Sequence, residues 1–320
     1  MLLLVGIAGT WLAWRYAVRR ALIDQPGDRR SHAVPTPRGG GVGIVAALLL
    51  ALTWLAWASP AERGLLGAMA AGLAMVAGIG WADDHRPLPA FLRLLVHALA
   101  AALLGGALLA HGSPPLLAAA AAVLALVLVN AWNFMDGIDG LAASQAALVA
   151  LGYLLVAGSG PVAWLAAALL AGALAFLPFN VPKARVFLGD VGSGALGFAL
   201  ACVAAMAWRG MPAGERLLLL LPLAAFVLDV GLTLASRIVN GERWWDAHVT
   251  HAYQRWARRS GHGKVTLAYG AWTLAGVLLM LRLPAWTGWS AGMAAAYLLA
   301  GMGAWWQLRN KGVEIMDGGE

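Results

Sequence analysis

Long apolar segments recur along the whole chain and are separated by short polar stretches. A helix needs about 20 apolar residues to cross a bilayer. The segments of suitable length and composition are Leu2–Val18, Gly41–Ala58, Gly64–Trp81, Phe91–Ala110, Leu116–Trp132, Leu141–Ala157, Val162–Phe179, Gly194–Trp208, Leu217–Ser236, Val265–Leu283 and Trp286–Leu308. This pattern predicts an all-α fold, a polytopic integral membrane bundle of about eleven transmembrane helices that forms one domain over residues 1–320.

Composition and charge agree with a membrane protein. Hydrophobic residues make up 61% of the chain and charged residues 12%, whereas soluble domains have about 45–50% apolar residues. With the N-terminus outside, all but four of the 22 Lys and Arg residues fall on one side of the membrane, a bias typical of the cytoplasmic side. We expect a periplasmic N-terminus, a cytoplasmic C-terminus, and cytoplasmic loops near residues 19–40, 82–90, 133–140, 180–193 and 237–264.

Three further features narrow the function classes. The first apolar segment has basic residues only after it, so we interpret it as a retained span and not as a signal peptide. Cys202 is the sole cysteine, which rules out an internal disulfide and makes a thiolate metal site implausible. The net charge of +7 is spread over loops and mixed with acids. This favours membrane lipids and phosphorylated substrates as partners and disfavours nucleic acid.

The first polar loop, residues 23–43, combines prolines, glycines and basic side chains. Its prolines prevent a continuous helix, and the run Gly39–Gly41 allows backbone amides to approach a ligand closely. Such a loop is suited to phosphate, with Arg38 as the basic residue nearest the glycines. The alternative is an ordinary basic loop that only obeys the orientation rule.

Two adjacent carboxylates, Asp83 and Asp84, end the third apolar segment. Neighbouring carboxylates repel each other, and the helix dipole disfavours negative charge at a C-terminus. A divalent cation such as Mg²⁺ would offset both effects. Arg93 and His97 follow four residues apart on the next segment and would share one helix face. The alternative is a solvated loop, with His97 a satisfied polar residue in the bundle.

Four polar residues spaced by three, Asn130, Asn133, Asp136 and Asp139, end the fifth segment. In a continuous helix each would lie about 60° behind the last, so Asp139 would face away from Asn130. Glycines at 137 and 140 suggest that the helix loosens, which could return all four to one pocket. Their oxygens suit Mg²⁺ or sugar hydroxyls.

Another polar group surrounds the start of the eighth segment. Asn180 ends the seventh segment, and Asp190 lies between glycines ahead of the eighth. A carboxylate with a flexible backbone on either side is a good metal ligand, and helix N-terminal amides nearby favour phosphate. The alternative is that Asp190 or Ser193 is a helix cap.

The last cytoplasmic loop places His248 and His251 three residues apart, with Arg255 one turn further on. No HEXXH motif is present, so phosphate or sugar contact is favoured over zinc. Asp229 lies inside the ninth segment. An acid at that depth is functional, or it is paired with a base such as Arg237.

The order of these motifs carries a resemblance. The sequence PTPRGGG, the pair Asp83–Asp84, the stretch NAWNFMDGIDGL, the segment FLGDVGS and a loop with histidines follow one another over essentially the whole chain. This order is similar to that of the polyprenyl-phosphate N-acetylhexosamine-1-phosphate transferases of glycosyltransferase family 4 type. The resemblance implies a bacterial inner-membrane enzyme, active at the cytoplasmic face, that transfers a sugar-1-phosphate from a UDP-sugar to undecaprenyl phosphate and releases UMP.

The resemblance also implies residue roles. Asp83, Asp84, Asp190 and His251 would be catalytic, with His251 contacting phosphate. The expected Mg²⁺ ligands are Asp190, Asp84 and Asn133, with Mn²⁺ as a substitute metal. The resemblance gives Asn133 and Asp136 a part in nucleotide binding. Together with the residue patterns above, it predicts substrate contacts from Arg38, Arg93, Asn130, Asn133, Asp136, Asp139, Asn180, His248 and Arg255. A homodimer is left open.

Departures from the family pattern bear on the substrate. His85 and Arg86 follow the acidic pair without a further acid, and the last loop reads HVTH where the peptidoglycan branch has three adjacent histidines. The branch that starts O-antigen or other surface polysaccharides is therefore favoured, with N-acetylglucosamine or a deoxy derivative such as FucNAc or QuiNAc. Phospho-MurNAc-pentapeptide transfer is the alternative. A transporter is a further alternative, although it would place its polar residues near the membrane midplane.

Overall fold

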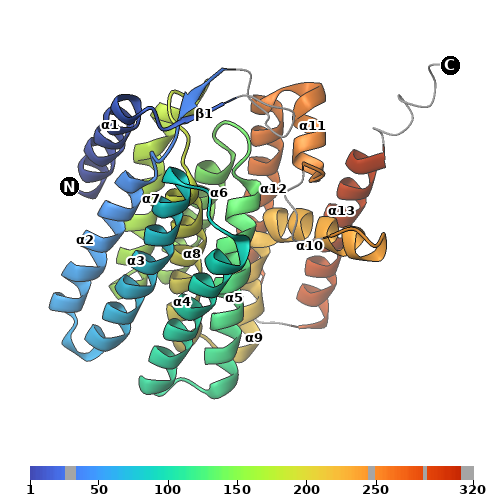
Figure 1. The fold of residues 1–320 in the computed structure, drawn as a ribbon. Helices are drawn as coiled ribbons and strands as arrows, with labels where there is room; N and C mark the ends of the chain where they lie inside the picture. The colour runs from blue at the N-terminus through green and yellow to red at the C-terminus, as the bar shows by residue number, and fades with distance from the viewer. Residues whose placement is uncertain (26–33, 244–248, 284–286, 311–320) are drawn as a thin grey trace.

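The computed structural model describes residues 1–25, 34–243, 249–283 and 287–310 and shows a bundle of mostly upright helices (Figure 1). Its first half contains α1 (Leu2–Arg20), α2 (Val42–Ala58), η1 (Pro60–Glu62), α3 (Arg63–His85), α4 (Ala90–Ala110), α5 (Pro115–Met135) and α6 (Leu141–Ala157). The second half contains α7 (Gly160–Asn180), α8 (Asp190–Gly210), α9 (Ala213–Arg216), η2 (Leu217–Leu223), α10 (Ala224–Val239), α11 (Ala252–Ser260), α12 (His262–Arg282) and α13 (Gly288–Asn310).

Each predicted apolar segment forms helix, which confirms the polytopic helical fold. Within the described residues, seven helical segments are long and apolar enough to cross a membrane, and α2 and α6 are shorter apolar helices. The count of eleven spans and the orientation stay predictions. The start of the last predicted segment, Trp286, lies outside the described residues. The all-α prediction misses one small feature, a two-residue antiparallel pair of β1 (Ile23–Asp24) and β2 (Thr36–Pro37).

Helix α8 forms the centre of the bundle. Nearly all of its spanning part is buried, 94% against 33–61% for the other six candidate spans. It packs against α3 and α5 along much of its length. Small residues permit this approach: a Cβ at Gly197 would lie 2.8 Å from the Cα of Val129 on α5. The helix that starts with Asp190 is therefore held rigidly by its neighbours.

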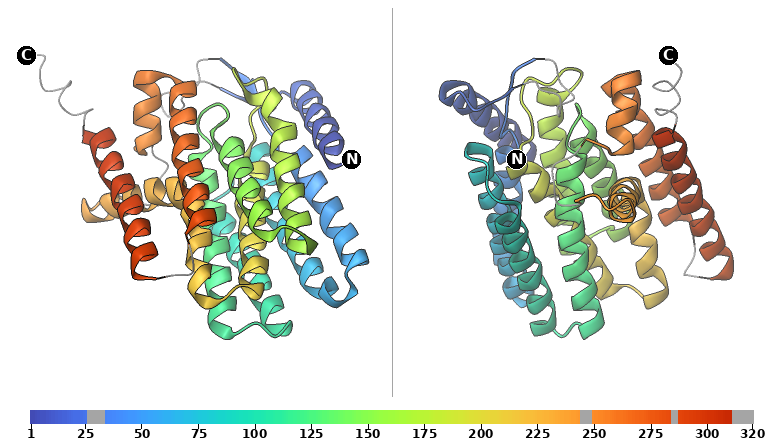
Figure 2. Two further views of the ribbon diagram at one scale, coloured as in Figure 1. Left: turned by 180° about the vertical axis from the view of Figure 1, so that it is seen from behind. Right: turned by 45° about the vertical axis from the view of Figure 1, so that its right-hand side comes forward.

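The ninth predicted segment, Leu217–Ser236, is not one straight helix. It follows directly on α9 and is divided into η2 and α10, and Pro222 lies within η2. Proline lacks the amide hydrogen that a regular helix needs at this point, so it favours a break. In Figure 1 and Figure 2, α10 lies across the direction of the upright helices and runs out toward α13. As a result, Asp229 on α10 contacts the start of α11.

The chain reversals that carry the polar clusters lie at one end of the bundle. The C-terminal ends of α3, α5 and α7, the start of α8 and the β1–β2 pair all lie toward the top of Figure 1. The opposite end holds the short connections 59–62, 111–114 and 211–212. The candidate residues for chemistry therefore meet at one face of the molecule.

Candidate active site

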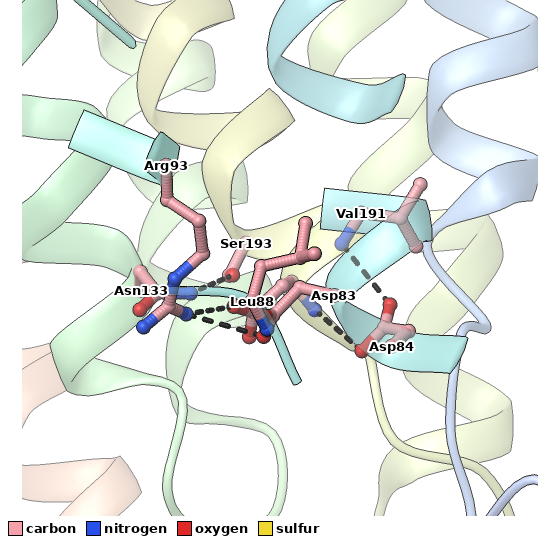
Figure 3. Close-up of polar contacts among 8 residues, drawn as sticks. Asp83, Asp84, Leu88, Arg93, Asn133, Val191 and Ser193 are labelled. Carbon is pink, nitrogen blue, oxygen red and sulfur yellow. Dashed lines mark hydrogen bonds and ion pairs between the residues drawn. The ribbon is translucent and has the colours of Figure 1, made fainter. Parts of the chain in front are cut away.

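Three charged side chains from α3, α4 and α8 meet at this end (Figure 3). Nη1 of Arg93, on the first turn of α4, lies 3.2 Å from Oδ2 of Asp83 and 2.7 Å from Oδ2 of Asp190. The amide of Leu88 donates to the other oxygen of Asp83 at 2.7 Å. All three charged side chains are partly accessible, Asp83 at 15% and the other two at 29%. One guanidinium therefore joins two carboxylates that a ligand can reach.

Asp84 is the buried member of the acidic pair, with 3% exposure. Its oxygens accept the amides of Asp190 and Val191 at 3.1 and 3.2 Å. These are the first two amides of α8, so Asp84 from α3 caps the N-terminus of α8 (Figure 3). Asp190 does not cap its own helix, so the alternative that it is a helix cap is wrong. The cap instead fixes the backbone of Asp190, the residue predicted to bind the metal.

The loop before α8 is tightly packed against the glycine run of the first polar loop. Gly189 has φ +76°, and a Cβ there would lie 2.5 Å from Oδ2 of Asp84, so only glycine fits. The amides of Gly40 and Gly41 donate to the carbonyls of Phe187 and Leu188, both at 2.9 Å. These two amides are thus used within the protein, and the interpretation of the glycine run as a phosphate-binding loop is wrong for them.

Asn133 and Asp136, at the C-terminal end of α5, complete this region. Asn133 donates to Ser193 Oγ on α8 at 3.2 Å, a bond that does not use its amide oxygen. Burial raises the pKa of Asp136 well above its ordinary value, and the nearby Asp190 and Asp84 carboxylates add to this effect. We call Asp83, Asp84, Asp136 and Asp190 the carboxylate cluster. It holds four acids, and the guanidiniums that act on it are those of Arg93 and Arg38.

The carboxylate cluster offers the oxygen donors that a hard divalent cation prefers. Two of its acids, Asp190 and Asp83, already share one positive group, the guanidinium of Arg93. In the described part of the chain, no three His, Cys, Asp or Glu side chains are close enough together to hold a metal ion by themselves. Magnesium is commonly held by one or two carboxylates together with substrate phosphates. Asp190, Asp84 and Asn133 thus stay the predicted ligands of a Mg²⁺ ion, which would take its remaining ligands from a phosphorylated substrate.

A second buried acid, Asp229, caps another helix. Its oxygens accept the amides of Ala252 and Tyr253, both at 3.0 Å, at the start of α11. Tyr269 of α12 donates its hydroxyl at 2.6 Å, and Nδ1 of His251 lies 3.6 Å away. We call this group the Asp229 clamp. Asp229 and His251 are both 2% exposed.

The clamp bears on the alternatives for Asp229 and also locates His251. The alternative pairing of Asp229 with Arg237 is not formed, because Nη1 of Arg237 lies 2.7 Å from Glu242 Oε2. His251 is close to the end of α5, its ring 5.9 Å from that of Phe134. It forms an ion pair with Asp229. Its catalytic role stays a prediction.

A third polar group holds the connection between α7 and α8. Oδ2 of Asp139 accepts the amide of Ala184 at 3.3 Å, and its Oδ1 lies 3.4 Å from Nδ1 of His262 on α12. The Asn180 side chain, 5% exposed, accepts from Gly140 at 2.6 Å and donates to Val186 at 3.0 Å. The helix does end at Met135 as expected, yet Asp139 turns toward this connection and away from the carboxylate cluster.

The remaining candidates lie apart from the cluster. Asn130 donates back to Leu126 within α5 at 2.8 Å. It also interacts with His97, which is 8% exposed and follows Arg93 by one turn of α4. Arg255 donates to the carbonyl of Arg309 at 3.1 Å. His248 lies outside the described residues.

Comparisons with known proteins place this arrangement in a family. Residues 66–208, which run from α3 to α8 and include all four acids of the cluster and Arg93, match the model of glycosyl transferase family 4. A decaprenyl-phosphate N-acetylglucosaminephosphotransferase of Mycobacterium leprae is 30% identical over 311 residues, covering 82% of this chain and 77% of the relative. This chain belongs to glycosyl transferase family 4.

Other relatives of this family 4 member divide between two names. The corresponding phosphotransferase of Mycobacterium tuberculosis is 34% identical over 226 residues, 60% of this chain and 55% of the relative. A phospho-N-acetylmuramoyl-pentapeptide-transferase of Heliobacterium modesticaldum is 36% identical over 178 residues, 50% of this chain and 52% of the relative. The chain thus spans about half the length of several curated relatives that it matches. The match confirms the family and leaves the branch open.

The structure adds residues that the sequence reasoning did not single out. Tyr253 donates to the carbonyl of Phe134 at 2.9 Å and so ties α11 to the end of α5. Burial and the nearby Asp229 and Asp136 raise the pKa of Tyr253 well above its ordinary value, which keeps its hydroxyl a donor. Tyr269 and His262 lie on α12, which begins at the end of the last polar loop. In the sequence, the position of Tyr253 two residues after His251 was the signal that could have pointed to it.

Proposed function

We propose that this protein transfers an N-acetylhexosamine-1-phosphate, GlcNAc or a deoxy derivative such as FucNAc or QuiNAc, from a UDP-sugar to undecaprenyl phosphate. UMP would be released, and the product would initiate O-antigen or another surface polysaccharide at the cytoplasmic face of the bacterial inner membrane. The single observation that carries the proposal is the Arg93 bridge between Asp83 and Asp190 at one end of a membrane bundle. The names of the mycobacterial relatives support the lipid acceptor and the sugar.

The reaction joins two anions, so the site must neutralise charge. We infer direct attack: an oxygen of the lipid phosphate forms a bond to the sugar-bearing phosphorus, and the bond from that phosphorus to UMP breaks. A phosphate monoester has a second pKa near 6, so the lipid phosphate is largely a dianion at neutral pH. Little deprotonation by a protein base is then required.

Each residue of the carboxylate cluster has a proposed part in this reaction. Arg93 and Arg38 supply fixed positive charge where the phosphates meet, which is mainly electrostatic stabilisation. Asp83 holds Arg93 in place through one oxygen, and the amide of Leu88 orients the carboxylate. Asp84 fixes the first turn of α8, and so the position of Asp190. A bound Mg²⁺ ion, held by Asp190 with Asp84 and Asn133, would polarise the diphosphate and stabilise the departing UMP.

The test is UMP release by the purified, detergent-solubilised protein with Mg²⁺. Undecaprenyl and decaprenyl phosphate would each be combined with a panel of UDP-N-acetylhexosamines and with UDP-MurNAc-pentapeptide. We expect UMP only when a polyprenyl phosphate and one UDP-HexNAc are both present. UMP from the pentapeptide donor would move the protein to the peptidoglycan branch that the Heliobacterium relative represents. A folded protein that releases no UMP from any donor would contradict the proposal.

A further inference from the structure

A group of arginines lies where α11 meets the C-terminal end of α13, away from the carboxylate cluster. We call Arg255, Arg258, Arg259 and Arg309 the arginine cluster. Arg255 and Arg259 donate to the carbonyls of Arg309 and Leu308, at 3.1 and 2.7 Å. These carbonyls belong to the last turn of α13, whose dipole favours cations. Helix capping therefore explains two of the four arginines.

Helix capping does not compensate all the positive charge of the arginine cluster. Burial lowers the pKa of Arg255, and Arg309, Arg259 and Arg258 lower it further, in that order. Glu242 is the acid that opposes these effects. Nη1 of Arg309 is buried and has no hydrogen-bond partner among the described residues. A buried cationic donor without an acceptor is costly, so the geometry calls for an anion.

An apolar cavity of about 290 Å³ lies directly beside these arginines, enclosed by α10, α11, α12 and α13. Trp256, Trp272 and Trp305 line it, and Asp229 and Tyr269 of the Asp229 clamp line it too. The charges adjoin the cavity, because the guanidinium of Arg309 lies 5.1 Å from the centre of the Trp305 ring and Arg259 donates to the carbonyl of Leu308, and both Trp305 and Leu308 line the cavity. Leu299, Met302 and Trp306 are exposed on α13, as expected for a helix that faces lipid.

We propose that this cavity and the arginine cluster form a binding site for one anionic phospholipid of the bilayer. The acyl chain would lie against the tryptophans, and the phosphate would accept from Arg309 and the neighbouring guanidiniums. The acceptor lipid of the proposed reaction is not the occupant, because its phosphate must reach the carboxylate cluster at the ends of α3, α5 and α8. The inference is independent of the proposed function, and its test does not use activity.

The experiment reads tryptophan quenching in the full-length protein, reconstituted in phosphatidylcholine nanodiscs. Brominated phosphatidylglycerol would replace lipid at 0–20 mol%, and brominated phosphatidylcholine would serve as the reference lipid. The proposal predicts a saturable quenching component for phosphatidylglycerol at low mole fraction and none for phosphatidylcholine. Equal quenching by both lipids at every fraction, as expected for general contact with the bilayer, would overturn it.

Two kinds of variant separate the charged rim from the cavity. R309Q and R259Q should each weaken the apparent affinity for phosphatidylglycerol at least about fivefold, whereas R19Q on α1 removes the same charge elsewhere and should not change it. G301A would narrow the cavity, since a Cβ there would lie 2.8 Å from Leu228 Cδ1, and should also weaken binding. R309Q and R259Q variants that fold and bind phosphatidylglycerol as the wild type does would contradict the site, whatever the behaviour of G301A.

Discussion

Asp84 and Asp229 each accept two consecutive backbone amides at the start of another helix, yet their surroundings differ. Asp84 stands beside three further carboxylates, with Arg93 and Arg38 as the cations that act on them. Asp229 is surrounded by donors, with Thr233, Tyr269 and His251 in addition to the two amides. Its charge is thus compensated inside the protein. We therefore expect the first carboxylate to belong to a group that binds a cation, and the second not to.

The two acids show that the surroundings of a buried acid in a membrane helix indicate its role better than burial does. Burial alone does not distinguish the two, since Asp84 is 3% exposed and Asp229 2%. Buried charge is expensive in either place. What separates a structural acid from a member of a reactive site is whether the nearby groups already balance its charge. The comparison predicts that substitutions in the two regions will have different effects.

The largest expected effect is that of Asp190→Asn on turnover. The substitution removes the charge that Arg93 and a metal would share, and it leaves the two amides that Asp84 accepts in place. We expect kcat for UMP release to fall roughly 10³-fold, as for the loss of a key electrostatic group, with little change in Tm. A variant that retains full Mg²⁺-dependent activity would remove Asp190 from the site.

Asp229→Asn should give the opposite result. It leaves a neutral group among donors that are arranged for a carboxylate, and breaking such a buried arrangement costs about 3 kcal/mol. We expect a clear fall in Tm, with kcat per folded molecule within about tenfold of wild type, roughly 1.4 kcal/mol. Thermal unfolding monitored beside UMP release checks both. A loss of kcat as large as that of Asp190→Asn would mean that the Asp229 clamp takes part in the chemistry.

Arg93→Gln tests the bridge between Asp83 and Asp190. Both carboxylates lose a partner, but solvent screens them because all three side chains are partly exposed. We expect kcat/KM to fall about 30-fold, roughly 2 kcal/mol, and the requirement for Mg²⁺ to become stronger. Arg19→Gln is the matched control on α1 and should behave as wild type. Equal losses in the two variants would point to a general charge effect.

The smallest expected effect concerns pH. Burial and the neighbouring carboxylates raise the folded-state pKa of Asp136, so its contribution to stability is present at low pH and is lost as pH rises through that pKa. Asp136→Asn removes this loss. In EDTA we expect its Tm to exceed that of wild type by more at pH 8 than at pH 5. Glu215→Gln, at the opposite end of the bundle, should show no such trend, and a constant difference in Tm would contradict the crowding of acids around Asp136.

The sequence predicted the helical segments and the gathering of polar motifs at one end, because both follow from local apolar length and charge. It also predicted that Asp83, Asp84 and Asp190 lie in one site. It did not predict that Asp84 would cap α8, since that depends on the packing of α3 against α8, 106 residues away. Nor did it locate the partners of Asp229 and Asp139, which come from α11, α12 and the connection before α8. The position of Asp229 could not be predicted because it depends on the break at Pro222, after which α10 runs across the bundle.

The central claim is that the carboxylate cluster binds the divalent cation that the reaction needs. Electron paramagnetic resonance with Mn²⁺ tests this most directly, by titrating wild type, Asp190→Asn and Asp229→Asn in the presence of UDP-N-acetylglucosamine. We predict that wild type and folded Asp229→Asn remove Mn²⁺ from solution at one site, which Mg²⁺ competes for, and that Asp190→Asn does not. Equal Mn²⁺ binding by Asp190→Asn and wild type would contradict the claim.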